Sequence, residues 1–322
     1  MIDNLAWGKR RQLTTAVINA DQAEMAAILE TIVAAGVGVL DERIAEAFED
    51  ELGKEINDPL KVQLERDQQL EQLTGEVLEE IGRRQHWLGP RYPFTLEGNA
   101  LKYKKSKTGV YEYCLAISCA PSLVAQPYAD LVRYFEVLVA DSFRAFLGSG
   151  ADFLRTGAPK ITHAKSSTDF EQGISVLHQA TQEWVWGPQP EALPDLPSVK
   201  DEGLDFVVWK RVDQRVGTLF LVGQCACGQT DWHEKDQDID ANFSKLRRWV
   251  SRLTFVPPVR AFAMPMPISA SKVFATLTER AGLTMDRLRL TSIAEDESNC
   301  DHFVAHHTPQ LQQYTDVVIK PA

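Results

Sequence analysis

The sequence has few cysteines, no long apolar run and no excess of positive charge, and each shortage excludes a class of protein. Its five cysteines are an odd number without a compact framework, so we expect free thiols in a reducing compartment rather than a disulfide scaffold. No apolar run approaches the roughly 18 residues that a membrane-spanning helix needs. The N-terminus also lacks the basic and apolar segments of a secretory signal. We therefore expect a cytoplasmic protein without a membrane partner.

The net charge of −11 is unfavourable for binding nucleic acid, but the charge is unevenly distributed. Residues 1–100 hold 19 of the 45 acidic and 10 of the 34 basic residues, a balance of −9 that leaves −2 for the rest. The later part of the chain could therefore focus a local basic groove. The acidic N-terminal part is expected to regulate the protein or to bind a protein partner.

The first hundred residues are predicted to be helical. Apolar residues recur at three- and four-residue spacing in three segments, 21–29, 41–51 and 59–84. Glycine, proline and aromatic residues then accumulate over 86–94, where we expect a domain boundary. We predict three parts: a helical N-terminal region over 1–95, a connecting α/β segment over 96–160, and a main domain with a C-terminal extension over 161–322.

The remaining chain alternates between strand and helix patterns. Short runs rich in β-formers predict strands over 110–117, 204–209, 217–227 and 259–264. Amphipathic runs predict helices over 128–147, about 167–186, about 241–253 and 272–281, and a proline-rich loop spans 187–197. This alternation predicts an α/β fold in which helices flank a mixed central sheet.

Two of the predicted strands carry polar residues suited to hydrolysis of a phosphodiester. Asp205 lies at the head of one strand and Gln224 near the end of the next, while Glu171 lies in the helix that precedes both. Hard oxygen ligands suit Mg²⁺ and also Mn²⁺, which can bind a phosphate oxygen and activate a water molecule. Neighbouring strands can direct alternate side chains to the same face. Asp205 and Gln224 are therefore candidate residues of such a site.

The order of these motifs resembles a known family. Phe170-Glu171, Gly203-Leu204-Asp205 and Gln224-Cys225-Ala226 are similar to the PD-(D/E)xK superfamily of restriction-endonuclease-like nucleases, and within it to the Mrr-like branch. The resemblance covers about residues 165–265. It implies a restriction-endonuclease-like core in which Glu171 and Asp205 are metal ligands and Gln224 replaces a metal-binding acid.

The chain departs from the family pattern at the lysine, which should lie at position 226, where Ala226 stands. Lys235 is our candidate replacement, and Lys210 is a weaker one because it should face away from Asp205 on an ideal strand. Each site residue also has a structural alternative. Glu171 could stabilise a helix end, and Lys235 could belong to a solvated helix face.

A basic surface could contact the phosphate backbone of nucleic acid. The candidate residues are Lys160, Lys165, Lys245, Arg247, Arg248 and Arg252.

The resemblance implies a Mg²⁺-dependent endonuclease that acts on nucleic acid, with DNA favoured, in defence against foreign DNA. Ala226 favours an alternative, a nuclease fold without chemistry that serves as a scaffold or binding subunit. A third interpretation is a zinc-stabilised protein that uses Cys225 and Cys227, but alternation places both thiols on one strand face, where buried cysteines behave as apolar residues. The sequence leaves open whether the chain forms a homo-oligomer.

Overall fold

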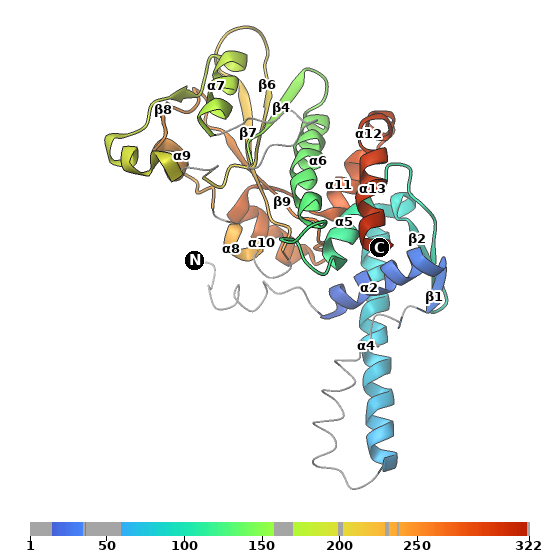
Figure 1. The fold of residues 1–322 in the computed structure, drawn as a ribbon. Helices are drawn as coiled ribbons and strands as arrows, with labels where there is room; N and C mark the ends of the chain where they lie inside the picture. Colours follow the sequence, from blue (N-terminus) through green and yellow to red (C-terminus); the bar gives the residue numbers. More distant parts are fainter. Residues whose placement is uncertain are drawn as a thin grey trace.

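A mixed five-stranded sheet forms the centre of the fold (Figure 1). The computed structural model describes residues 15–34, 36, 59–157, 170–198, 202–228, 232–236 and 238–320. The strands of the sheet are β4 (Ala151–Arg155), β6 (Phe206–Lys210), β7 (Leu219–Cys225), β9 (Val259–Ala263) and β10 (Leu283–Met285). Their spatial order is β10-β9-β7-β6-β4. The strands β4, β6 and β7 pair antiparallel, whereas β9 is parallel to both β7 and β10.

Helices cover both faces of the sheet because both faces are apolar. One face of the sheet carries the side chains of Phe206, Val208 and Leu221, which share a buried core with the helices that cover this face. Those helices are α5 (Val110–Cys119), α6 (Ala129–Leu147), α11 (Arg287–Ala294), α12 (Cys300–His306) and α13 (Thr308–Ile319). We refer to this side as the α6 face.

The opposite face is formed by the alternate residues, among them Val207 and Val222. It is covered by α7 (Phe170–Thr181), η3 (Pro190–Ser198), α9 (Ser244–Arg247) and the two-stranded sheet of β5 (Val185–Trp186) and β8 (Val250–Arg252). Near β9, α8 (Trp232–Lys235) and α10 (Ser271–Ala281) pack on Phe262 and Met264. We refer to this side as the α7 face.

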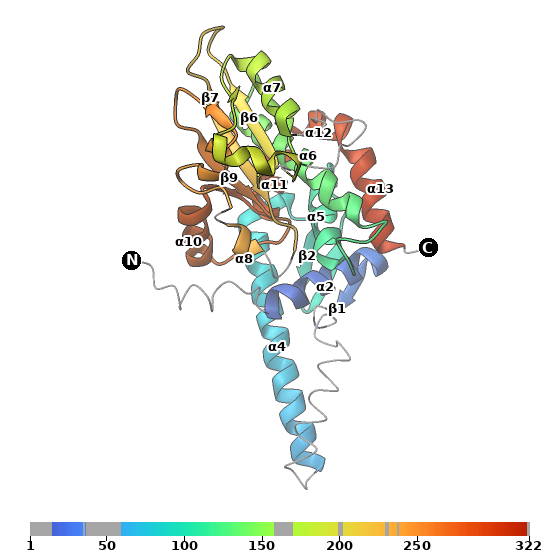
Figure 2. The same ribbon diagram turned by 60° about the vertical axis from the view of Figure 1, so that its left-hand side comes forward.

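The N-terminal part contains α2 (Thr15–Glu30), β1 (Ile32–Ala34), α4 (Pro59–Leu88), η2 (Gly89–Arg91), β2 (Phe94–Glu97) and β3 (Ala100–Tyr103). The strands form a small antiparallel sheet in the order β1-β3-β2. In both views the first turns of α4 project away from the rest of the described chain (Figures 1 and 2). Because β1 pairs with β3, residues on both sides of position 95 share this sheet.

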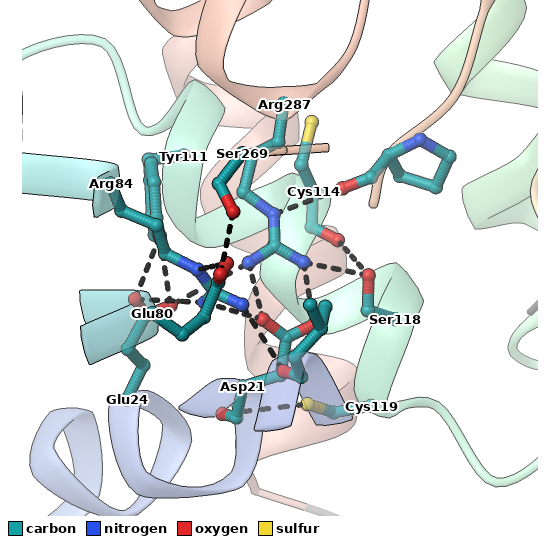
Figure 3. Close-up of polar contacts among 12 residues, drawn as sticks. Asp21, Glu24, Glu80, Arg84, Tyr111, Cys114, Ser118, Cys119, Ser269 and Arg287 are labelled. Carbon is teal, nitrogen blue, oxygen red and sulfur yellow. Dashed lines mark hydrogen bonds and ion pairs between the residues drawn. The ribbon is translucent and has the colours of Figure 1, made fainter. Parts of the chain in front are cut away.

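A buried cluster of charges fastens the N-terminal helices to α11 (Figure 3). Nη1 of Arg84 in α4 lies 2.7 Å from Oδ1 of Asp21 and 2.9 Å from Oε1 of Glu24, both in α2. Nη2 of Arg287, at the start of α11, lies 2.8 Å from Oδ2 of Asp21. Glu80 completes the cluster, 2.9 Å from Arg84 Nε. Residues far apart in the chain therefore meet in one ionic network.

The sequence predictions of helices and strands are largely confirmed, with three errors. The helices predicted over 21–29, 59–84, 128–147 and 272–281 and the strands over 204–209, 217–227 and 259–264 are present, with shifted ends. The helix predicted over 41–51 lies outside the described residues. The mixed α/β fold with helical elements at the N-terminus is therefore confirmed.

The strand predicted over 110–117 is wrong, because these residues form α5. Every residue of α5 from Val110 to Ser118 is buried. A helix that is apolar on every side has no polar stripe, so its sequence resembles that of a buried strand.

The other two errors concern β5 and β8, which pair with each other. The helix predicted to reach residue 186 ends at Thr181, after which Gln182 and Trp184 have positive φ angles of 62° and 61°. The helix predicted over 241–253 stops at Arg247, and the residues after it form β8. Pairing between distant segments has overridden local helix preference here. The predicted loop at 187–197 largely forms the 3-10 helix η3.

Candidate active site

Asp205 is held by hydrogen bonds directly before the first residue of β6. Its backbone carbonyl accepts hydrogen bonds from the amides of Thr156 and Gly157 at 2.9 and 3.2 Å, and its own amide donates to the carbonyl of Gly223 at 3.0 Å. Its carboxylate Oδ2 accepts a hydrogen bond from the amide of Cys225 at 2.7 Å. Asp205 therefore lies between the ends of β4 and β7, where these bonds fix the orientation of its side chain.

A second carboxylate reaches this end of the sheet from α6. Glu136 is buried, and its Oε2 lies 2.5 Å from Nη2 of the fully buried Arg155, the last residue of β4. A Cβ atom on Gly157 would lie only 2.5 Å from the same Oε2. The backbone after β4 thus passes directly under the Glu136 carboxylate, and Arg155 offsets its charge.

The thiols of Cys225 and Cys227 lie within the electrostatic influence of both acids. Burial raises the pKa of both thiols well above its ordinary value, and the negative charges of Asp205 and Glu136 raise it further. Both side chains belong to the core on the α6 face, as their alternation along the strand predicts. The raised pKa keeps both thiols protonated, and among the described residues they join no set of metal ligands.

Gln224 points to the opposite side of β7. Its Nε2 donates a hydrogen bond to Oδ2 of Asp238 at 2.8 Å, and Nζ of Lys245 lies 3.0 Å from Oδ1 of the same carboxylate. Partial burial would raise the pKa of Asp238, but the hydrogen bonds from Gln224 and Lys245 lower it below its ordinary value. Gln224 therefore orients an anionic carboxylate next to the sheet end.

Lys235, in α8, lies near both groups. Its positive charge lowers the pKa of Cys227 against the effect of burial, and it also lowers the pKa of Asp238. The side chain is half-buried. The amine is thus close to the end of β7, near the thiol that Glu136 and Asp205 also influence.

We call Glu136, Arg155, Asp205 and Lys235 the sheet-end site. Two carboxylates provide the hard oxygen ligands that Mg²⁺ or Mn²⁺ prefers, and an amine beside them can stabilise an anion. The two acids are thus of the ligand type that suits a divalent cation, while Oε2 of Glu136 is already paired with Arg155.

The expected pairing between the strand that follows Asp205 and the strand that holds Gln224 is confirmed, since Phe206 of β6 pairs with Gly223 of β7.

Glu171 is placed differently from Glu136. It is exposed on α7, whose buried side chains, Phe170 and Ile174 among them, pack on the α7 face. The helical acid that the structure brings near Asp205 is therefore Glu136, which the sequence analysis missed.

A signal for Glu136 was present in the sequence. It lies in an amphipathic helix, next to Phe135 and Val137, in the element directly before the first strand of the antiparallel set. A buried acid in an apolar stripe needs a partner, so it is a candidate site residue.

Lys210 does not join the site, because its Nζ donates to the carbonyl of Leu147 at 2.6 Å. The basic residues of α9 and β8 are on the surface or near it. Arg247 donates to the carbonyl of Asn242 at 2.9 Å, Arg248 pairs with Asp195 at 2.9 Å, and the guanidinium of Arg252 lies 4.8 Å from the centre of the Phe255 ring. Lys160 and Lys165 lie outside the described residues.

A second polar cluster lies on the far side of α6. Asp141 in α6, His302 in α12 and His307 between α12 and α13 direct their side chains toward one point. Burial alone would raise the pKa of Asp141, but hydrogen bonds from His307, Arg144 and His302 lower it below its ordinary value. The sequence shows the histidines but gives no sign that their partner is an aspartate more than 150 positions earlier.

Comparisons of the chain with protein families, with curated proteins and with solved structures found no match. Among the described residues, no helix combines the length and apolar character that crossing a membrane requires.

Proposed function

We propose that this protein is a divalent-metal-dependent nuclease that hydrolyses phosphodiester bonds at the sheet-end site. The observation that carries the proposal is that Gly157 links the two acids: its amide donates to the carbonyl of Asp205 at 3.2 Å, and a Cβ atom on it would lie 2.5 Å from Oε2 of Glu136. The positive charge of Lys235 acts on the same region, at the Cys227 thiol. The proposal also rests on the resemblance to Mrr-like nucleases, with Glu136 in place of Glu171 as the helical acid.

Each residue has a role that follows from its position. Asp205 and Glu136 would hold Mg²⁺ or Mn²⁺, which supplies Lewis-acid activation of water when bound. Arg155 reduces the repulsion between the two carboxylates and positions Glu136. Lys235 would stabilise the charge that develops on the phosphate, and Gln224 orients Asp238 beside it.

The proposed substrate is nucleic acid, with DNA favoured, and the proposed setting is defence against foreign DNA in the cytoplasm. The acidic N-terminal region is proposed to regulate the nuclease or to bind a protein partner, because its charge is unsuited to contact with phosphates.

The direct test is cleavage by the purified full chain. Supercoiled plasmid, linear duplex, single-stranded DNA and RNA would be incubated with Mg²⁺ or Mn²⁺ and with either the wild type or a variant. Asp205→Asn keeps an oxygen that can accept the Cys225 amide but removes the charge, and Glu136→Gln does the same in α6. We expect each to lower the cleavage rate by about 100-fold or more, and Lys235→Met to do likewise.

Glu171→Gln is the matched control, since Glu171 is an exposed acid of a helix. We expect it to retain the wild-type rate. Loss of activity in Glu171→Gln but not in Glu136→Gln would show that the wrong helical acid has been assigned. Full activity of Asp205→Asn would show that cleavage does not take place at the sheet-end site.

One alternative has an observation in its favour. Ala226 replaces the family lysine, and Glu136 is already paired with Arg155. Both features would suit a nuclease fold that binds nucleic acid without cutting it. This scaffold function would be favoured if the wild-type protein binds DNA but cleaves none of the substrates with either metal.

A further inference from the structure

The cluster of Asp141, His302 and His307 has the geometry of a metal-binding set. Oδ2 of Asp141 lies 2.6 Å from Nε2 of His302 and 2.7 Å from Nε2 of His307. The three atoms all lie within 4.8 Å of one another. They come from α6, from α12 and from the junction of α12 and α13, so each element supplies one ligand atom to a shared point.

The two polar neighbours of Nε2 of His302 require different protonation states of this nitrogen. It lies 2.8 Å from Nη2 of Arg144, which can only donate, and 2.6 Å from the Asp141 carboxylate, which can only accept. If Nε2 carries a proton, it has no lone pair to accept the N–H of Arg144. If it carries none, its lone pair lies against the lone pairs of the Asp141 carboxylate. A cation among the three ligand atoms would accept the lone pairs of Nε2 and of the carboxylate, and Nη2 of Arg144 would then turn away from Nε2, which has no second lone pair to accept its N–H.

The groups around the cluster support the same arrangement. Nδ1 of His307 lies 3.0 Å from the hydroxyl of Tyr134, an outer partner that fixes the ring and leaves Nε2 to face Asp141. Nε of Arg144 donates to Oδ1 of Asp141, the carboxylate oxygen that faces away from both histidines. His307 is buried, but a third of the His302 side chain is exposed, so the cluster opens to solvent on one side.

We propose that Asp141, His302 and His307 form a binding site for a divalent transition metal of the zinc class. Two imidazoles and a carboxylate are ligands typical of Zn²⁺, whereas Mg²⁺ prefers oxygen ligands alone. The site fastens α12 and α13 to α6, and its open side provides a fourth position for water or another ligand.

This metal centre is separate from the sheet-end site. Asp141 follows Glu136 by five positions, which places the two side chains about 140° apart around α6. Metal binding here can therefore be measured independently of nuclease activity.

The test is a metal titration of the purified full chain after treatment with a chelator. Co²⁺ is the spectroscopic probe, because its visible absorption is strong when nitrogen ligands hold it in a tetrahedral site, and Zn²⁺ should displace it. We expect one such Co²⁺ per chain, and His302→Ala to weaken binding by roughly 100-fold. His307→Ala should do the same, and Tyr134→Phe should weaken binding by about 10-fold.

Two controls make the result specific. His86→Ala removes an exposed histidine of α4 and should leave the titration unchanged. Asp205→Asn should also leave the Co²⁺ spectrum unchanged, which separates this centre from the sheet-end site. A third of the His302 side chain is exposed, which allows replacement with little loss of packing, so His302→Ala remains informative if His307→Ala fails to fold. Absence of nitrogen-type Co²⁺ absorption in the wild type, or unchanged absorption in His302→Ala, would overturn the proposal.

Discussion

Gly157 illustrates how single atoms position the sheet-end site. A Cβ atom at this position would lie 2.5 Å from Oε2 of Glu136 and 3.3 Å from Nη2 of Arg155. Gly157→Ala must therefore push the carboxylate or the backbone aside. We expect a loss of about 1–3 kcal/mol in the free energy of unfolding and at least a tenfold loss of cleavage rate.

Gly82→Ala is the matched control, because a Cβ atom there meets nothing within 4 Å and the residue lies inside α4. It should stabilise the protein by about 0.5–1 kcal/mol in the same urea titration and leave the cleavage rate unchanged. Wild-type activity in Gly157→Ala would contradict the tight contact with Glu136.

The buried thiols make the free energy of unfolding depend on pH in the alkaline range. Burial raises the pKa of Cys114 to about 12, whereas an unfolded cysteine has a pKa of about 8.5. Because the folded pKa is the higher one, this stabilisation is complete below the unfolded pKa and is lost as the pH rises toward the folded pKa. The free energy of unfolding should fall by up to about 1.4 kcal/mol per pH unit for this thiol.

Urea denaturation between about pH 8 and 10 would measure this slope. Cys114→Ala removes one such thiol, so its stability should decline less steeply than that of the wild type. Equal slopes in the two proteins would show that the thiol does not titrate in this way.

At the residue scale, the sequence predicts those parts of the site that lie on two strands adjacent along the chain. Asp205 lies at a strand head that is visible in the sequence, and its neighbour β7 follows directly. Glu136 could not be assigned in the same way, because its place beside Asp205 depends on how α6 crosses the sheet. Gln224 was placed on the right strand, but its partner Asp238 comes from a segment without a recognisable pattern.

At the element scale, the buried ionic cluster makes a sharp prediction for α4. Arg84 is fully buried and contacts Asp21, Glu24 and Glu80. Arg84→Met leaves these acids with less positive charge in a buried environment, so we expect a loss of about 3–5 kcal/mol in the free energy of unfolding. Urea denaturation monitored by circular dichroism would measure it.

The adjacent Arg83 provides a matched control on the same helix. Its side chain is 40% exposed. Its Nη1 pairs with the exposed Glu79, and its Nε lies 3.2 Å from Oε2 of Glu80, a carboxylate that Arg84 still holds when Arg83 is replaced. Arg83→Met should change the free energy of unfolding by no more than about 1 kcal/mol. Similar losses in the two variants would mean that the buried network does not hold α2 and α4 to α11.

Elements whose patterns are local were predicted correctly, and those defined by distant partners were not. The amphipathic α6 and α10 were recognised from their spacing, whereas α5 has no polar side that would reveal its period. The strands β5 and β8 exist because they pair across more than sixty positions. No local rule could identify that pairing.

At the scale of the whole molecule, the order β10-β9-β7-β6-β4 brings the candidate residues to one end of the sheet. The sequence predicted the alternation of helices and strands but not this order, since strand order is set by packing across the complete chain. It also did not predict that the acidic N-terminal helices would share a buried network with α11, which joins positions 21 and 287.

Because the molecule is acidic as a whole, its affinity for DNA depends on local basic groups. The chain carries a net charge of −11, so attraction to DNA must come from local basic groups such as Arg247 and Arg252, both exposed near the α7 face. If each contacts one phosphate, replacing both by glutamine should lower the slope of log affinity against log salt by about 2. Fluorescence anisotropy with duplex DNA, in an Asp205→Asn background that does not cleave, would measure the slope. Lys102→Gln, on β3, removes an exposed charge elsewhere and should leave it unchanged. A slope that is the same in all three proteins would place the DNA on another surface.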